Sequence, residues 1–218
     1  AEALYQLGWF DRAVAEWKRL AERKEPHDIA VFRLRDDAFN RRDWESAAKW
    51  QERVIARQPD ESRHWERLAR IYWYMDHLPE ALWAVEQAIK VDSVPVTAFY
   101  MKAETLYLMK NYDGAKQAYE DIVSRNPNSL RALEGLVYAQ EAQRDVAGAR
   151  ATMRRMERLI KPFGGNASPY LKIHDARLLA EQGWFNSALR ALGPLAKERR
   201  PAIPVLLYHG LTRFERGE

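Results

Sequence analysis

The residues that could do chemistry in this chain do not have the spacing of a catalytic or metal site. None of the five histidines belongs to a His-Glu-x-x-His pair, and none has close metal-ligand spacing. Those histidines are His27, His64, His77, His174 and His209. The absence of cysteine excludes disulfides, zinc–thiolate sites and cysteine nucleophiles. The sequence therefore predicts no enzyme, no metal and no cofactor.

The charged residues have the pattern of a solvated helical surface. The 218 residues include 35 Lys and Arg and 31 Asp and Glu, which are interspersed and give a net charge of +4. Such a mild positive balance is compatible with a preference for acidic partners. No stretch of about 18 apolar residues occurs, so we expect no membrane span.

An alanine recurs along the chain with a period of 34 residues. The alanines are Ala13, Ala47, Ala81, Ala115, Ala149 and Ala188, with spacings of 34, 34, 34, 34 and 39. A large apolar residue stands three positions before each of them: Phe10, Trp44, Leu78, Tyr112, Val146 and Phe185. A further apolar residue stands seven positions after each: Leu20, Val54, Ala88, Ile122, Met156 and Leu195. Internal repeats of this length are typical of stacked helical units.

Each repeated feature has a physical reason. An alanine lets two helices approach closely, and the flanking apolar residues form one helical face. Pro59 and Pro127 fall where the second helix of a unit must end, because proline lacks an amide proton and clashes with the preceding turn. A helix pair cannot bury its own apolar face, so neighbouring pairs must stack on it.

These features divide the chain into helix–turn–helix units. We expect units near residues 1–27, 28–61, 62–95, 96–129, 130–163 and 169–202, a partial unit over 203–218, and an irregular loop over 161–169 that carries the five extra residues. In the sixth unit, Leu171, Ile173, Ala176 and Leu179 are the candidates for burial. Gly8, Gly183 and Gly217 mark the turn inside a unit, where positive φ is useful, and the other units hold Arg42, Asp76, Lys110 and Arg144 at the same place.

The repeat resembles the tetratricopeptide repeat. The third unit carries the pattern most clearly, with Trp65-Glu66-Arg67-Leu68-Ala69, then Tyr72, Leu78, Ala81 and Ala88. The resemblance covers essentially the whole chain and implies an all-α, right-handed superhelical solenoid of antiparallel helix–turn–helix repeats. It implies about six repeats in a single solenoid over 1–218. Neither end has an obvious polar cap, so we expect a fragment of a longer array.

The resemblance also implies where a partner binds, because the first helices of the family line the concave side. Large aromatics and arginines dominate binding hot spots, although any one ring could instead pack between helices. The candidate residues are Phe32, Phe39, Arg63, Arg67, Arg70, Trp73, Tyr74, Tyr100, Glu104, Tyr107 and Tyr138. Within this set, Arg70, Trp73, Tyr74 and Tyr107 could stack on and hold an acidic or extended peptide.

One subtype of the family grips a carboxy-terminal carboxylate with lysine, asparagine and arginine at set first-helix positions. The matching positions here hold Phe32, Asp36, Arg67, Thr97 and Met101. Arg67 is the one basic residue among them and is out of place, so this docking function is disfavoured.

The function we expect is a protein-interaction scaffold that binds a peptide or protein partner on an aromatic and basic groove. Its specific version is a part of a bacterial envelope or secretion assembly, in the periplasm or cell envelope. The alternatives are a module for polysaccharide handling or export and an RNA-binding helical repeat. The strict spacing, modest charge and inner-face glutamates argue against nucleic acid. End-to-end self-association is expected through apolar residues at the two ends: Leu4, Leu7, Leu206, Leu207 and Phe214.

Overall fold

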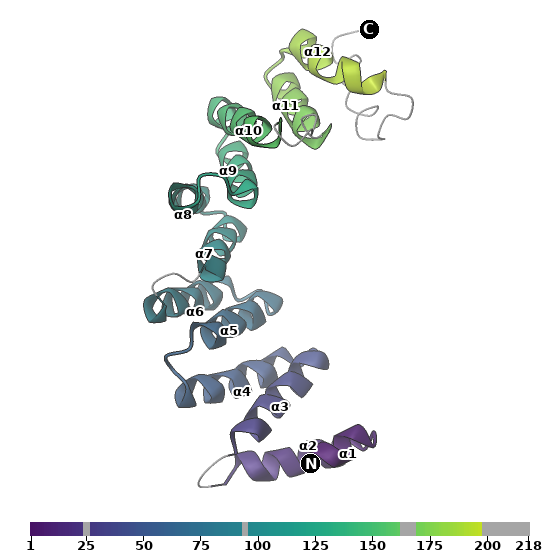
Figure 1. Ribbon diagram of the computed structural model, residues 1–218, viewed down its shortest axis with the longest axis vertical. Coiled ribbons are helices and arrows are strands. Elements are labelled where there is room, and N and C mark those ends of the chain that lie inside the picture. The colour runs from purple at the N-terminus through teal and green to yellow at the C-terminus, as the bar shows by residue number, and fades with distance from the viewer. Residues whose placement is uncertain (24–26, 93–95, 162–168, 198–218) are drawn as a thin grey trace. The chain divides into compact units, whose positions relative to one another are not determined.

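The computed structural model describes residues 1–23, 27–92, 96–161 and 169–197, and all regular elements among them are helices (Figure 1). In chain order the helices are α1 (Glu2–Gln6), α2 (Phe10–Ala21), α3 (Asp28–Asn40), α4 (Trp44–Arg57), α5 (Ser62–Tyr74), α6 (Leu78–Val91), α7 (Val96–Leu108), α8 (Tyr112–Arg125), α9 (Leu130–Ala142), α10 (Val146–Ile160), α11 (Pro169–Glu181) and α12 (Phe185–Ala196). The predicted all-α class and the helix–turn–helix repeat are confirmed.

The chain forms two compact units, Ala1–Ala118 and Tyr119–Glu218, and α8 begins in the first and ends in the second. Within the first unit, α1 packs on α2, α3 on α4 and α5 on α6, and each second helix also contacts the following first helix. Within the second unit, α9 packs on α10, α10 on α11 and α11 on α12. Each unit therefore consists of successive helix pairs that cover one another's apolar faces.

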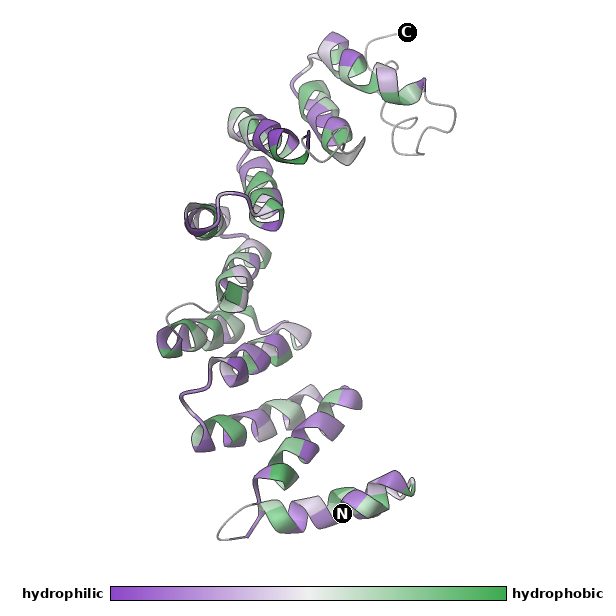
Figure 2. Cartoon of the chain, viewed as in Figure 1, coloured by the Kyte–Doolittle hydropathy of each residue, from purple (hydrophilic) through white to green (hydrophobic). Residues whose placement is uncertain are grey.

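The repeated alanines are fully buried positions of the second helices. Ala13, Ala47, Ala81, Ala115, Ala149 and Ala188 are each 0% exposed. Around them the helices have separate hydrophobic and hydrophilic sides (Figure 2). The apolar residues seven positions later are also buried, except the half-buried Leu20. The residues three positions earlier are less covered, and Phe10 is 48% exposed. The full burial of the alanine agrees with the expectation that this position lets two helices approach closely.

Most of the helix ends and the sixth unit's buried face also match the sequence. Helix α4 ends two residues before Pro59 and α8 ends two residues before Pro127. Leu171, Ala176 and Leu179 are buried in α11, and Ile173 is half-buried beside them. Most of the expected loop over 161–169 and all of the partial unit over 203–218 lie outside the described residues.

Each turn inside a helix pair contains a residue with positive φ. This residue is Gly8 or Gly183 in two pairs, and Arg42, Asp76, Lys110 or Arg144, with φ of 60 to 61°, in the others. The turn positions are confirmed, with positive φ at Gly8 and Gly183 and also at the four non-glycine residues, while Gly217 lies outside the described residues. In the turn after α3, the Arg42 amide donates to the Phe39 carbonyl and the Asp43 amide to the Ala38 carbonyl, at 3.0 and 2.9 Å. This is the Schellman arrangement, in which a left-handed residue ends the helix.

Glycine at one of the cationic turn positions is expected to stabilise the chain. A left-handed conformation costs an L-residue about 1–2 kcal/mol, and the extra chain entropy of glycine offsets part of the gain. We expect Arg42→Gly to raise the free energy of unfolding by about 0.5–1 kcal/mol in urea titrations followed by circular dichroism. The neighbouring Arg41 has φ of −79°, so Arg41→Gly should lower stability instead. Equal effects of the two substitutions would contradict the left-handed turn.

Candidate partner-binding site

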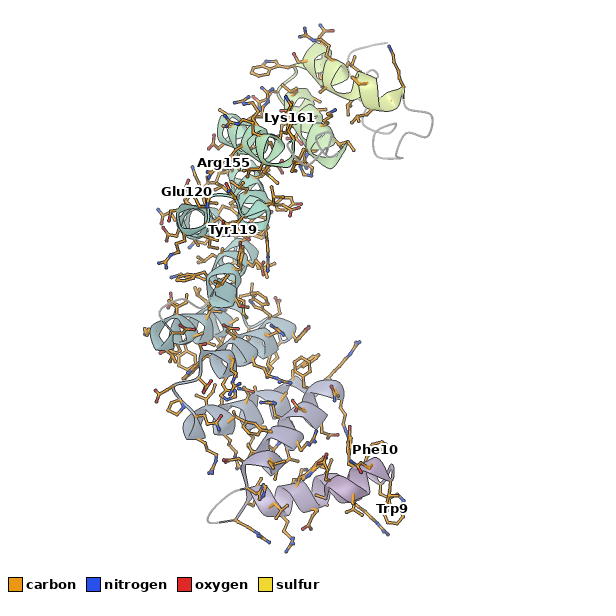
Figure 3. All side chains as sticks on the ribbon, in the orientation of Figure 1. Trp9, Phe10, Tyr119, Glu120, Arg155 and Lys161 are labelled. Atoms are coloured by element: carbon orange, nitrogen blue, oxygen red, sulfur yellow. The ribbon has the colours of Figure 1, made fainter. Side chains whose placement is uncertain are left out.

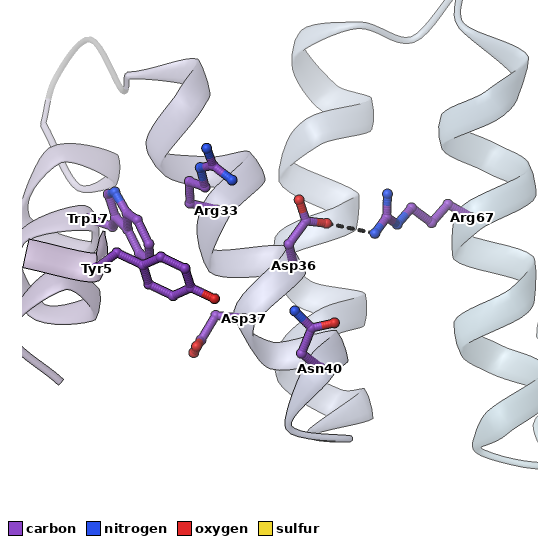
Figure 4. A pocket seen from close by; sticks show the side chains of 7 residues that line it. All are labelled: Tyr5, Trp17, Arg33, Asp36, Asp37, Asn40 and Arg67. Carbon is purple, nitrogen blue, oxygen red and sulfur yellow. Dashed lines mark hydrogen bonds and ion pairs between the residues drawn. The ribbon is translucent and has the colours of Figure 1, made fainter. Parts of the chain in front are cut away.

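A polar cavity of about 260 Å³ lies among the first helices of the first unit (Figure 4). Tyr5 and Trp17 form one side and Arg67 the other, and the α3 side chains lie between them. The full lining is Tyr5, Trp17, Arg33, Asp36, Asp37, Asn40 and Arg67. The α3 residues follow a spacing of three or four, which places them along one face of the helix.

The charged side chains of this cavity are already paired with one another or with a neighbour. The Asp36 carboxylate accepts from Arg67 on α5 at 2.6 Å and from Arg35 at 2.8 Å. Arg33 pairs with Glu2 of α1 at 2.5 Å, and the Asp37 carboxylate pairs with Arg41 at 3.1 Å. Asp36 is therefore the anion that joins two successive repeats across the cavity wall.

A buried polar network lies behind this wall. The Gln51 side chain of α4 is 0% exposed; its Nε2 donates to the His64 carbonyl at 2.8 Å, and its Oε1 accepts from Arg35 at 3.4 Å. His64 Nε2 lies 2.8 Å from the Gln58 side-chain oxygen. Burial lowers the pKa of His64, and Arg63 and Arg35 lower it further. The network therefore contains the neutral imidazole and holds α3, α4 and α5 in register.

An aromatic cluster lies beside the cavity at the turns inside the second and third repeats. Trp44 and Tyr74 stack with ring centroids 4.5 Å apart and planes at 14°, and Phe39 meets both rings edge-on at 5.2 and 5.7 Å. The Arg67 guanidinium lies 5.6 Å from the Phe39 ring. Because Tyr74 is 55% exposed, this cluster joins the polar cavity to an open aromatic surface.

A second hollow, of about 710 Å³ and widely open, lies at the turn between α1 and α2. Trp9 and Phe10, labelled in Figure 3, line it together with Arg12, whose guanidinium lies 5.2 Å from the Trp9 ring.

In the second unit, Glu141 accepts from Arg177 at 2.5 Å and contacts His174 Nδ1 at 3.1 Å. Burial alone would raise the pKa of Glu141, but these two partners outweigh it and the pKa is lowered.

In the part of the chain that the structure describes, no group of three or more His, Cys, Asp or Glu side chains could hold a metal ion. None of the helices described there has both the length and the hydropathy needed to cross a bilayer.

Comparison with known proteins supports the repeat assignment. The sequence model of the tetratricopeptide repeat matches residues 66–115 and 100–162. A tetratricopeptide repeat protein of Parabacteroides merdae has a similar structure, with a TM-score of 0.64 at 17% identity, covering 100% of this chain and 85% of that one. The chain belongs to the tetratricopeptide repeat family.

Several known proteins resemble all or part of this tetratricopeptide repeat chain. U-box domain-containing protein 70 of Oryza sativa subsp. japonica is 28% identical over 138 residues, which are 62% of this chain and 17% of that protein. Hsp70-Hsp90 organizing protein 2 of Arabidopsis thaliana is 26% identical over 139 residues, 62% of this chain and 24% of that protein. The matched part thus spans less than a quarter of the length of these relatives. The structure of YrrB, described as a TPR protein with an unusual peptide-binding site, has a TM-score of 0.64 at 13% identity. The matched region covers 93% of this chain and 98% of the YrrB chain.

The predicted site residues of this tetratricopeptide repeat chain fall into different environments. Trp73 is half-buried, and its indole N–H donates to the Thr105 hydroxyl at 2.8 Å. Tyr107 is half-buried against Tyr112, with ring centroids 5.4 Å apart. Tyr100 is 7% exposed and packs inside the unit, so little of its ring is available to a partner. Glu104 is half-buried on the same helix.

Three other predicted residues lie on α3 and α5, the helices that also contribute to the cavity. Phe32 is half-buried and stacks on His64 with ring centroids 6.0 Å apart. Arg63 is exposed and pairs with Glu61 at 3.2 Å. Arg70 is exposed and makes no hydrogen bond or ion pair with the described residues.

Tyr138 belongs to the second unit, where its hydroxyl donates to Glu134 at 3.4 Å and its ring meets His174 edge-on. The structure therefore brings Phe39, Arg67 and Tyr74 together in the first unit, with Arg70 one turn along α5 from Tyr74.

Sequence reasoning missed the partners of these residues. Trp44 was singled out as the recurring large apolar residue before the alanine; it is half-buried against the core and also stacks on Tyr74. Asp36 and Arg67 are 31 residues apart in the sequence, which is three residues fewer than the length of the repeat. In a 34-residue repeat this spacing puts two side chains one helical turn apart on adjacent first helices, and a search for opposite charges at that spacing would have found the pair.

Proposed function

We propose that this chain is a protein-interaction scaffold that holds an extended peptide segment of a partner along α3 and α5. The observation that carries the proposal is the exposed Arg70, which has no ion-pair partner among the described residues, beside the half-exposed stack of Trp44 and Tyr74. An unpaired arginine next to exposed rings is the composition of a binding hot spot.

The charge of Arg70 favours an acidic residue in the partner. Its guanidinium can bind a carboxylate through two parallel hydrogen bonds. Burial raises the pKa of the neighbouring Glu66, and the positive charge of Arg70 offsets only part of this rise. Phe39, Trp44 and Tyr74 would receive an apolar side chain of the same peptide.

The relatives are consistent with peptide binding by this fold. One is named as an organizing protein of Hsp70 and Hsp90, and YrrB is described as having a peptide-binding site. We do not extend the proposal to a carboxy-terminal carboxylate clamp. Arg67, the one basic residue at the matching positions, is held by Asp36 at 2.6 Å.

A displayed library of random peptides, selected on the purified chain, tests this proposal. Peptides that bind the wild type are expected to bind an Arg70→Ala/Tyr74→Ala variant at least tenfold more weakly in fluorescence polarisation, since hot-spot truncations cost about 2 kcal/mol or more. Trp83→Ala is the matched control, because Trp83 is a 50% exposed aromatic on the second helix α6. Circular dichroism must show that all three proteins fold alike.

Other outcomes would redirect the assignment. Equal binding by wild type and the double variant would place the peptide site elsewhere. Selection of glycans instead of peptides on an array would favour the polysaccharide alternative. Binding of RNA that weakens steeply with salt would favour the nucleic-acid alternative, since salt competes for phosphate contacts.

The biological assembly and the self-association stay predictions. An envelope or secretion machine in the bacterial periplasm is the setting we propose for such an array. Of the residues proposed for end-to-end association, Leu7 is 66% exposed, whereas Leu4 packs on the cluster around Trp17. Leu206, Leu207 and Phe214 lie outside the described residues.

A further inference from the structure

We infer that the cavity between α1, α3 and α5 takes an uncharged polar side chain of the bound peptide (Asn, Gln, Ser or Thr) and rejects ionised ones. This inference rests on the proposed function and adds the chemistry of a second position in the partner. The cavity is continuous with the proposed peptide surface, because Arg67 lines it and also lies over Phe39, which contacts Tyr74.

The charges of the cavity select against an ionised ligand. Its lining contains two cations, Arg33 and Arg67, and two anions, Asp36 and Asp37, and each already has an ion-pair partner. An incoming carboxylate would have to displace Asp36 from Arg67, and an incoming ammonium would have to displace Arg67 from Asp36. Either displacement breaks the Asp36–Arg67 ion pair in a half-buried site and leaves Asp36 with Arg35 alone, so charged side chains are disfavoured.

The same lining selects against an apolar side chain. Besides the ion pairs, the cavity presents the Tyr5 hydroxyl and the Asn40 amide, which together supply donors and acceptors. An apolar group would take water away from these atoms without replacing its hydrogen bonds. An amide or hydroxyl can bind them while every ion pair stays intact.

The size of the cavity agrees with one side chain. Its volume of about 260 Å³ lies just below the range of roughly 300–1,000 Å³ usual for sites that hold a whole small molecule. Arg67 and Arg70 are three residues apart on α5, which is about 4.5 Å along the helix. The polar residue in the cavity and the acidic residue at Arg70 are therefore expected close together in the peptide sequence.

The test first finds which peptide position enters the cavity. Because the chain contains no cysteine, an Asn40→Cys variant has a single thiol, and a bound peptide scanned with cysteine should form a disulfide from the cavity position alone. At that position, affinities are then measured for Gln, Glu, Lys and Leu peptides by fluorescence polarisation. Wild type is expected to bind the Gln peptide at least tenfold more tightly than the other three.

Two variants should shift this preference in opposite directions. Asp36→Asn removes the anion that pairs with Arg67, so the Glu peptide should gain at least tenfold relative to the Gln peptide. Arg67→Gln removes the cation, so the Lys peptide should gain instead, and this variant keeps the test valid if Asp36→Asn does not fold. Asp60→Asn is the matched control, because Asp60 is exposed in the connection between α4 and α5 and should change nothing.

The outcomes separate this inference from the proposed function. Tight binding of the Glu or Lys peptide by wild type, or a Gln preference that neither variant changes, overturns the inference and leaves the peptide site standing. Failure of every selected peptide to bind through the Arg70 and Tyr74 surface overturns both.

Discussion

Ala47→Leu is expected to lower the free energy of unfolding by about 3 kcal/mol. Ala47 is 0% exposed and belongs to the core cluster that joins α3, α4, α5 and α6. The three added carbon atoms have no free volume to enter, so the α4 contacts must open, and overpacking of this kind costs about 1–3 kcal/mol and occasionally more. In a chain of this size the thermal midpoint should fall by roughly 6–12 °C.

The control for Ala47→Leu is the same substitution at an exposed position of the same helix. Ala56 is exposed near the end of α4, so Ala56→Leu should change stability by no more than about 0.5 kcal/mol. Unfolding in urea, followed by circular dichroism at 222 nm, measures both variants. If the two leucines cost the same, the repeated alanine is not the point of closest helix contact.

Gly135→Ala is expected to destabilise the second unit by about 2 kcal/mol, although alanine is normally the better helix former by about 1 kcal/mol. Gly135 is buried in the middle of α9, and a Cβ there would lie 2.2 Å from two ring carbons of Tyr119 on α8. Tyr119 is itself 6% exposed, so its ring has little room to move. The glycine is therefore required by the close approach of the ring.

The sign of the Gly135→Ala effect should reverse when the ring is removed. In a Tyr119→Ala background, which is itself less stable because of the cavity it leaves, adding Gly135→Ala should raise stability by about 1 kcal/mol through helix propensity. A double-mutant cycle from thermal unfolding measures this coupling. Destabilisation of equal size in both backgrounds would show that the ring is not the cause.

The repeated elements of the fold could be predicted because they depend on periodicity. Gly8 and Gly183 marked the left-handed turn by their type, and the 34-residue period then located it at Arg42 and Lys110, where the residue type gives no such signal. The period also identified Ala47 and its equivalents, which are fully buried. Local physics and spacing suffice here, since every repeat has to solve the same packing problem.

The candidate site could be predicted less completely, since it consists of residues that differ between repeats. The sequence placed Tyr74 and Arg70 on the first-helix surface, and both are exposed there. It also placed Tyr100 there, although this ring is 7% exposed in the core. A helix position that faces the next repeat can be covered or open, depending on the side chains opposite, and periodicity carries no information on that point.

By itself, the sequence determined the family, the helix pairs, their turns and the absence of cysteine chemistry. Only the tertiary structure decided which first-helix charges are paired, such as Asp36 with Arg67, and that Arg70 makes no ion pair with the described residues. It also decided that Gln51, Arg35 and His64 form a buried polar network inside an apparently amphipathic pattern. The physical reason is that side chains in successive repeats pair only where their lengths and the helix packing angle bring them into contact. Both conditions depend on residues that are distant from one another in the sequence.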